Sequence, residues 1–178
     1  MGSEAITPTR VYTVGHSTHS IEDFLELLDI HSVELLVDVR RFPGSRRLPH
    51  FNSEPLKSEL SARGIAYMHA DGLGGRRKLR GDKTKAAWKA ASFQAYAEHM
   101  ETSEFVESLE TLIDEAMKRP TAVMCAEALW WKCHRRLIAD ALSAKGHEVV
   151  HIFLGGKVEE HKLPDFAEVD QGVLFYES

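Results

Sequence analysis

The chain has 178 residues, of which 43% are hydrophobic and 28% are charged, the balance of a globular domain with a sizeable core. No apolar run reaches the roughly 18 residues of a membrane span, and the first residues lack the apolar core of a signal peptide, so neither membrane insertion nor export is expected. Two cysteines are too few for a disulfide scaffold, and we expect a reducing, cytoplasmic setting.

The net charge of −5 is distributed unevenly along the chain. Arginines gather in residues 40–47, and a second basic segment covers residues 76–85, whereas acidic residues gather in residues 101–115. Such asymmetry favours an anionic ligand at one face of the molecule. Two solvated loops would produce the same pattern, so charge alone does not decide between the two interpretations.

Strand and helix patterns alternate along the chain. Short β-branched or continuously apolar runs predict strands at residues 11–14, 33–37, 65–68, 120–125 and 148–153. Helical periodicity predicts helices at residues 21–28, from Asn52 or Ser53 to Gly64, at 88–100, at 103–118 and from Cys133 to Gly146. This alternation predicts an α/β fold, a single three-layer domain with a mainly parallel sheet of about five strands and helices on both faces.

The whole chain, residues 1–178, is predicted to be this one domain, without internal repeats. Residues 1–9 are predicted to be disordered and residues 76–86 to form a mobile basic loop. Residues 155–178 are predicted to form a C-terminal tail packed on the domain, with one short edge strand at residues 173–176.

Polar and reactive residues follow the predicted strands. Because parallel strands end at one edge of a sheet, these side chains are expected to share a crevice, the place where open α/β sheets bind ligands. In chain order they are His16, Ser17, Asp38, Arg40, Asp71, Cys125 and Glu127.

The sharpest local pattern is Cys133-His134-Arg135, at the start of a predicted helix. Free backbone N–H groups and the positive end of the helix dipole favour an anion there, and Arg135 would bind it bidentately. The same field would lower a thiol pKa, which indicates a Cys/His/Arg centre that also includes Cys125. Alternatively, the cysteines are small buried hydrophobic residues without a chemical role.

Two other kinds of site are less well supported by the spacing. Nine residues separate Cys125 from Arg135 and none is glycine, which argues against a tyrosine-phosphatase-type loop. The two cysteines and His134 could join His16 or His50 around a metal, but these residues show neither CxxC nor HxxxH spacing. Structural zinc is therefore not expected and no cofactor is required, although a catalytic metal stays open as an alternative.

Residues 40–52 interleave arginines with Phe42 and Phe51, a combination that suits a phosphate beside a stacked base. Trp130 and Trp131 are either core residues or a stacking platform worth ~1–3 kcal/mol per base. The residues predicted to bind substrate or anion are Ser17, Arg40, Ser45, Arg46, Asn52, Gly74, Gly75, Trp130, Trp131 and Arg135. The residues predicted to be catalytic are Cys125, Glu127, Cys133, His134, His16 and Asp38.

Several short motifs occur together in this chain: Gly15-His16-Ser17, Asp38-Val39-Arg40 with Pro43 and Ser45, Phe51-Asn52, Leu73-Gly74-Gly75, Cys125-Ala126-Glu127, Cys133-His134-Arg135, and the stretch from His161 to Ala167. With these motifs the chain resembles a bacterial and archaeal family catalogued as domain of unknown function 488. The resemblance implies that the paired cysteines are the functional centre, and it implies no particular reaction. The Trp-Trp-Lys before Cys133 resembles the version of one subgroup.

The leading hypothesis is a hydrolase or transferase that binds a phosphate-bearing substrate, a nucleotide or nucleic-acid component, at the carboxyl ends of the strands. Cys125 would be the nucleophile or thiolate, Glu127, His16 or His134 would handle protons, and Asp38 would orient an arginine or act as base. The alternatives are a non-catalytic nucleic-acid-binding module and a thiol redox sensor. The expected partner is an anionic small molecule or single-stranded nucleic acid rather than a membrane, and the oligomeric state is left undecided.

Overall fold

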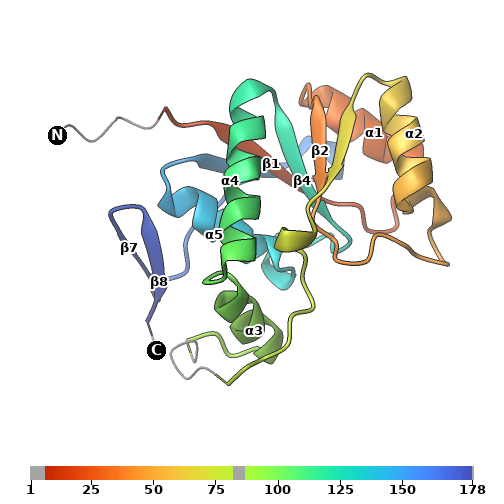
Figure 1. Ribbon diagram of the computed structural model, residues 1–178. Coiled ribbons are helices and arrows are strands. Elements are labelled where there is room, and N and C mark those ends of the chain that lie inside the picture. The colour runs from red at the N-terminus through yellow and green to blue at the C-terminus, as the bar shows by residue number, and fades with distance from the viewer. Residues whose placement is uncertain (1–6, 82–86, 178) are drawn as a thin grey trace.

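The computed structural model describes residues 7–81 and 87–177, in which a six-stranded sheet carries helices on both faces (Figure 1). The strands of the sheet are β1 (Arg10–Gly15), β2 (Leu35–Asp38), β3 (Ala66–His69), β4 (Thr121–Cys125), β5 (Glu148–Ile152) and β6 (Val158–Glu160). Their order is β3-β2-β4-β1-β5-β6, and all neighbours are parallel except β5 and β6. The predicted α/β class is confirmed, with an added antiparallel edge strand.

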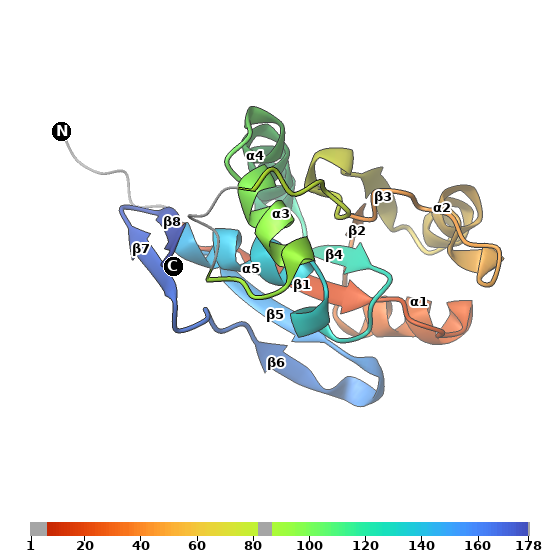
Figure 2. The same ribbon diagram turned by 90° about the horizontal axis from the view of Figure 1, so that it is seen from below.

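The helices divide between the two faces of the sheet, as Figures 1 and 2 show. On one face lie α1 (Ile21–Ile30) and α2 (Ser53–Ala62), and on the other lie α3 (Ala91–His99), α4 (Ser103–Lys118) and α5 (Arg135–Ala144). Successive strand residues point to opposite faces, so Leu36 joins the core under α1 and α2, whereas Val37 joins the core under the other three helices. Burial on both faces explains the continuous apolar character of β2.

Local signals placed the starts of α1 and α4 well, whereas the helices predicted to begin at residue 88 and at Cys133 begin at Ala91 and Arg135. Ser20 caps α1 by accepting a hydrogen bond from the Asp23 backbone N–H at 3.1 Å, and Thr102 caps α4 by accepting from the Phe105 N–H at 3.2 Å. Gly64, at φ +75°, follows the end of α2, where a left-handed residue costs glycine little.

The C-terminal segment contains more strands than the one predicted. Besides β6, it forms an antiparallel hairpin of β7 (Ala167–Asp170) and β8 (Val173–Tyr176), and the Tyr176 hydroxyl donates to Asp140 of α5 at 2.7 Å. Alternation is hard to see in such short strands, because β6 and β7 are mostly exposed and charged.

Residues 1–6, 82–86 and 178 lie outside the described part of the chain, so the predictions for residues 1–9 and 76–86 fall partly there. Residues 7–9 and 76–81 have no regular secondary structure. Among the residues that are described, no helix combines the length and the apolar character that crossing a membrane requires.

Candidate functional site

A cleft of about 710 Å³ opens where β1, β2 and β4 end. Segments that follow four strands line it, together with α3 and the residues that precede α5. The cleft brings together nine of the predicted site residues: His16, Ser17, Arg40, Ser45, Gly75, Cys125, Glu127, Cys133 and His134. Parallel topology explains why residues so far apart in the sequence meet here.

Gly15 allows the loop after β4 to lie directly on the end of β1. A Cβ atom at Gly15 would be 1.8 Å from the Glu127 carbonyl oxygen, a distance that no side chain tolerates. The His16 N–H donates to the Cys125 carbonyl, and the Ser17 N–H donates to the Ala126 carbonyl, both at 2.9 Å. The parallel pairing of β1 and β4 thus continues past Cys125, the last residue of β4, into the loop that follows it.

Cys133 and His134 form a hydrogen-bonded pair at the wall of the cleft. The Cys133 Sγ lies 3.5 Å from His134 Nδ1, and His134 Nε2 lies 2.8 Å from the Val39 carbonyl oxygen. Because a carbonyl only accepts, Nε2 carries the proton and neutral His134 presents Nδ1 to the thiol as an acceptor. Burial lowers the pKa of His134, which favours this neutral form. His134 is therefore placed to accept the thiol proton.

The loop after β3 approaches this pair closely because it lacks side chains. A Cβ atom at Gly75 would lie 2.8 Å from His134 Nδ1, and one at Gly74 would lie 2.9 Å from the Arg41 Cα. Gly74 does not line the cleft, whereas Gly75 does. The predicted Gly-Gly pair therefore serves close backbone approach, and Gly75 leaves the space in which the His134 ring sits.

Arg135 is buried at 1% exposure and is absent from the cleft lining. The guanidinium therefore holds the two thiol-bearing segments together, and it does not present a free face to an anion in the cleft. Its side chain makes four hydrogen bonds: Nε donates to Cys125 Sγ at 3.0 Å, Nη1 to Thr13 Oγ1 at 3.0 Å, and Nη2 to the carbonyl oxygens of Glu127 at 2.7 Å and Ala128 at 3.1 Å. Its backbone N–H donates to Cys133 Sγ at 3.4 Å.

The two thiols are free, buried and unequal. Burial raises the pKa of Cys125, and the neighbouring Cys133 raises it further. For Cys133, burial opposes the thiolate, but the hydrogen bond with Cys125 and the charge and N–H donors of Arg135 outweigh it, so the pKa is lowered. Of the two thiols, Cys133 is therefore the one whose ionisation the surroundings favour.

The Thr13 hydroxyl that accepts from Arg135 Nη1 begins a chain of hydrogen bonds between buried or partly buried side chains. From Thr13 Oγ1 it runs 2.5 Å to His151 Nδ1, then 2.9 Å from His151 Nε2 to His161 Nδ1, and then 2.6 Å from His161 Nε2 to Asp140 Oδ1. With Asp140 as the terminal acceptor, each histidine donates through Nε2 and accepts through Nδ1. Burial lowers the pKa of His151 to about 2, consistent with a neutral ring. We call Thr13, His151, His161 and Asp140 the buried relay.

The two tryptophans lie beside this relay and not in the cleft. Trp130 stacks on His151 with ring centroids 4.3 Å apart and an interplanar angle of 4°. Trp131 packs edge-on against Trp130 and is 40% exposed. Neither ring lines the cleft, so the predicted stacking platform is not placed where a cleft-bound base would lie.

Arg40 and Asp38 form a second buried group, on the β2 side. Arg40 Nε and Nη2 donate to the two carboxylate oxygens of Asp38 at 2.9 and 2.7 Å, and the Tyr67 hydroxyl donates to the same carboxylate at 2.6 Å. His16 Nδ1 donates to the Ser17 carbonyl at 2.9 Å, which leaves Nε2 as the acceptor for Arg40 Nη1 at 3.4 Å. Burial lowers the pKa of His16 to about 4. Asp38 thus orients Arg40, which lines the cleft.

The remaining predicted binding residues differ in position. Asn52 lies outside the cleft lining, but its Oδ1 accepts a hydrogen bond from the Ser45 N–H at 2.6 Å and so shapes the loop that does line it. Arg46 is exposed and is not among the lining residues, and Asp71, which follows β3, is also exposed and outside the cleft.

Sequence reasoning missed four important lining residues, which are Arg41, Arg76, Lys132 and Tyr96. The two arginines belong to basic segments that were recognised, but charge clustering alone did not single them out. Tyr96 belongs to α3, whose contribution depends on how that helix packs. Within the described residues, no group of three His, Cys, Asp or Glu side chains is arranged to hold a metal ion.

Comparison with known proteins identifies the family. Neither a curated protein nor a solved structure matches the chain. A family described as Domain of unknown function DUF488 matches residues 20–142, which is more than half of the chain and includes Arg40, both cysteines, His134 and Arg135. The chain therefore belongs to the DUF488 family.

Proposed function

We propose that the chain is an enzyme that binds a phosphate-bearing substrate in the cleft and uses Cys133 as its nucleophile. The observation that carries the proposal is the Cys133–His134 pair, in which Nδ1 faces the thiol while the Val39 carbonyl holds Nε2. A nucleophile, a base within hydrogen-bond reach and a third group that orients the base are the arrangement found in nucleophilic catalysis.

The substrate class is inferred from the lining of the cleft. Arg40, Arg41, Arg76 and Lys132 line it, and its volume of about 710 Å³ is within the range of small-molecule and cofactor sites. Cationic side chains around a pocket of this size suit a nucleotide or a nucleic-acid component. Glu127 is the carboxylate among the lining residues and is available for proton transfer.

Cys133 is a better nucleophile candidate than Cys125, although the sequence favoured Cys125. The pKa of Cys133 is lowered and that of Cys125 is raised by burial, so the thiolate forms more readily on Cys133. The Cys125 Sγ also lies 3.5 Å from the Glu127 carbonyl and accepts from Arg135. Cys125 therefore helps to lower the pKa of Cys133 through their hydrogen bond and is not itself the nucleophile.

The reaction follows from these positions. His134 Nδ1 takes the Cys133 proton, and the thiolate attacks the electrophilic atom of the substrate as the bond to the leaving group breaks. His134 returns its proton to the leaving group, and water or an acceptor hydroxyl then displaces the thiol. The lining arginines stabilise the negative charge that develops on the substrate.

Turnover of nucleotides and phosphoesters by Cys133→Ser, with Cys125→Ser as the matched control, tests the proposal. We expect Cys133→Ser to lose roughly 100-fold or more in rate, because a serine hydroxyl beside a neutral histidine is a poorer nucleophile. Cys125→Ser should lose less. Wild-type rates for Cys133→Ser on every substrate that the native enzyme turns over would contradict the proposal.

A thiol redox switch is a second candidate, favoured by one observation. Both thiols contact Arg135 and interact with each other, so oxidation by a peroxide would join them in a disulfide with loss of two hydrogens. Intact mass after mild peroxide, before and after a dithiol reductant, separates the two functions. A reversible disulfide in a protein that turns over none of the screened substrates would favour the switch.

A further inference from the structure

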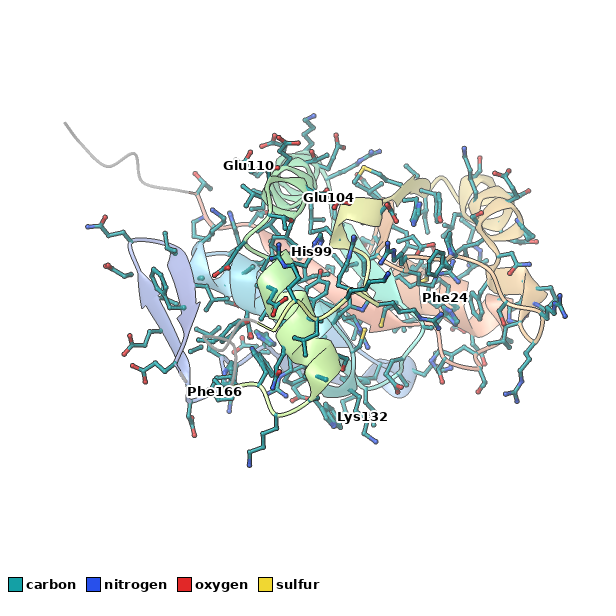
Figure 3. The ribbon with its side chains drawn as sticks, turned by 60° about the horizontal axis from the view of Figure 1, so that its bottom comes forward. Phe24, His99, Glu104, Glu110, Lys132 and Phe166 are labelled. Atoms are coloured by element: carbon teal, nitrogen blue, oxygen red, sulfur yellow. The ribbon has the colours of Figure 1, made fainter. Side chains whose placement is uncertain are left out.

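A second cavity, of about 310 Å³, adjoins the cleft. Arg41 and Arg76 line both cavities, so the two lie next to each other. Figure 3 shows His99 and Glu104 close together where α3 is followed by α4, with Lys132 near the other end of α3. The second cavity lies at the His99 end, and its lining is Arg41, Arg76, Arg77, Lys78, Arg80, Ala95, His99 and Thr102.

The positive charge of this second cavity is only partly neutralised. Arg77 and Arg80 form ion pairs with Glu104 at 3.7 Å and Glu98 at 3.4 Å. Among the described residues, none of the other three cations of the lining forms an ion pair, and Arg41 Nη1 instead donates to the Arg76 carbonyl at 2.8 Å. Three of its five cations therefore have no carboxylate partner in the described part of the chain, a setting that attracts phosphate.

An exposed aromatic ring in the cleft lining contacts Arg41, one of the two residues that line both cavities. Phe42 lines the cleft and is 64% exposed, and the Arg41 guanidinium lies over its ring, 5.6 Å from the centroid. An exposed aromatic ring beside arginines allows a base to stack while a neighbouring phosphate is held.

We propose that the second cavity binds a backbone phosphate of a single-stranded nucleic acid whose adjacent nucleotide occupies the cleft. This inference rests on the proposed function of the cleft and defines its substrate as a strand and not a free nucleotide. The cations that line both cavities would follow the backbone, and Phe42, in the cleft lining, would stack a base of the strand. Such contacts make binding strongly dependent on salt.

Lys78 is the residue to test, because it lines the second cavity but not the cleft. It is also exposed and forms no ion pair with a described residue. Lys78→Glu is compared with Lys57→Glu, the same charge change on an exposed residue of α2. Fluorescence anisotropy measures binding of a labelled six-nucleotide strand, and competition measures binding of a mononucleotide. We expect Lys78→Glu to weaken strand binding roughly fivefold or more and to reduce the salt slope by about 1, with mononucleotide affinity unchanged.

The outcomes separate this inference from the proposed function. Equal losses in Lys78→Glu and Lys57→Glu, or a strand that binds no tighter than the mononucleotide, overturn the strand site while leaving the cleft proposal intact. A nucleoside triphosphate that binds as tightly as the strand and depends equally on Lys78 also overturns it. Strand binding that depends on Lys78 in a protein with no thiol-dependent turnover supports the second site and contradicts the proposed catalysis.

Discussion

Two buried arginines beside the cleft are held in opposite ways. Arg40 forms a bidentate ion pair with Asp38, whose side chain is fully buried. Arg135 instead donates to a thiol, a hydroxyl and two carbonyl oxygens, all of which are uncharged acceptors. It reaches the carboxylate of Asp140 only through the buried relay.

The difference shows which arginine acts on the thiols. A carboxylate in direct contact cancels most of the field of an arginine at longer range, whereas neutral acceptors leave that field in place. The charge of Arg135 therefore favours the Cys133 thiolate, whereas Arg40 is balanced by Asp38 and fixed beside His16. We expect thiol reactivity to depend on Arg135 and to be insensitive to the Arg40–Asp38 pair.

Arg135→Met should have the largest effect. The change removes the donors of four side-chain hydrogen bonds from a buried site, and we expect a loss of roughly 3–5 kcal/mol in the free energy of unfolding. It should also raise the pKa of Cys133. Urea unfolding measures the first, and the pH dependence of iodoacetamide alkylation in a Cys125→Ser background measures the second. An unchanged alkylation profile in a folded variant would show that Arg135 does not act on the thiol.

The pH dependence of the free energy of unfolding tests the neutral state of His16, the buried histidine beside Arg40. Burial lowers the pKa of His16 from 6.5 in the unfolded chain to about 4, so the unfolded chain binds the proton first as pH falls. Stability should therefore decrease from about pH 6.5 down to about pH 4, by about 3 kcal/mol at most, and this contribution should stay constant below that range. His16→Gln should remove it. Parallel urea-midpoint curves for wild type and variant would contradict the assignment.

Asp38→Asn should be less damaging than loss of Arg135. Asparagine keeps the shape of the carboxylate but leaves the Arg40 charge unpaired. Because Arg40 lines the cleft, where solvent can reach it, we expect a cost of about 1.5–3 kcal/mol. The pKa of Tyr67, raised by burial and by Asp38, should fall in this variant. The alkylation profile of Cys133 should not move, and a shift as large as that of Arg135→Met would remove the distinction between the two arginines.

Tyr176→Phe should have the smallest effect. It removes one of the hydrogen bonds to Asp140 and leaves the relay from His161 in place, so about 1 kcal/mol is expected. Thermal unfolding of the variant and of Tyr12→Phe, a tyrosine outside the relay, provides the comparison. A loss comparable to that of Arg135→Met would show that the C-terminal hairpin sets the position of Arg135.

Much of the fold was predictable because its causes are local. Ser20 and Thr102 cap helices through contacts three residues away, and the continuous apolar run of β2 reports burial on both faces. The meeting of His16, Arg40, Cys125 and Cys133 at one cleft was also predictable, since parallel strands end at the same edge. The strands β6 and β7 were missed, because short exposed strands leave little pattern.

The sequence by itself determined the α/β alternation, the sheet edge at which the candidate site lies and most of the residues that gather there. Only the tertiary structure decided which of those residues face the cleft. The Arg135 side chain is directed into the protein and not into the cleft because it donates a hydrogen bond to Thr13, which lies 122 residues earlier in the chain. The Trp130 ring lies outside the cleft because it stacks on His151 of β5. Periodicity and capping act over a few residues, whereas the direction of a buried guanidinium or indole depends on partners that only folding brings within reach.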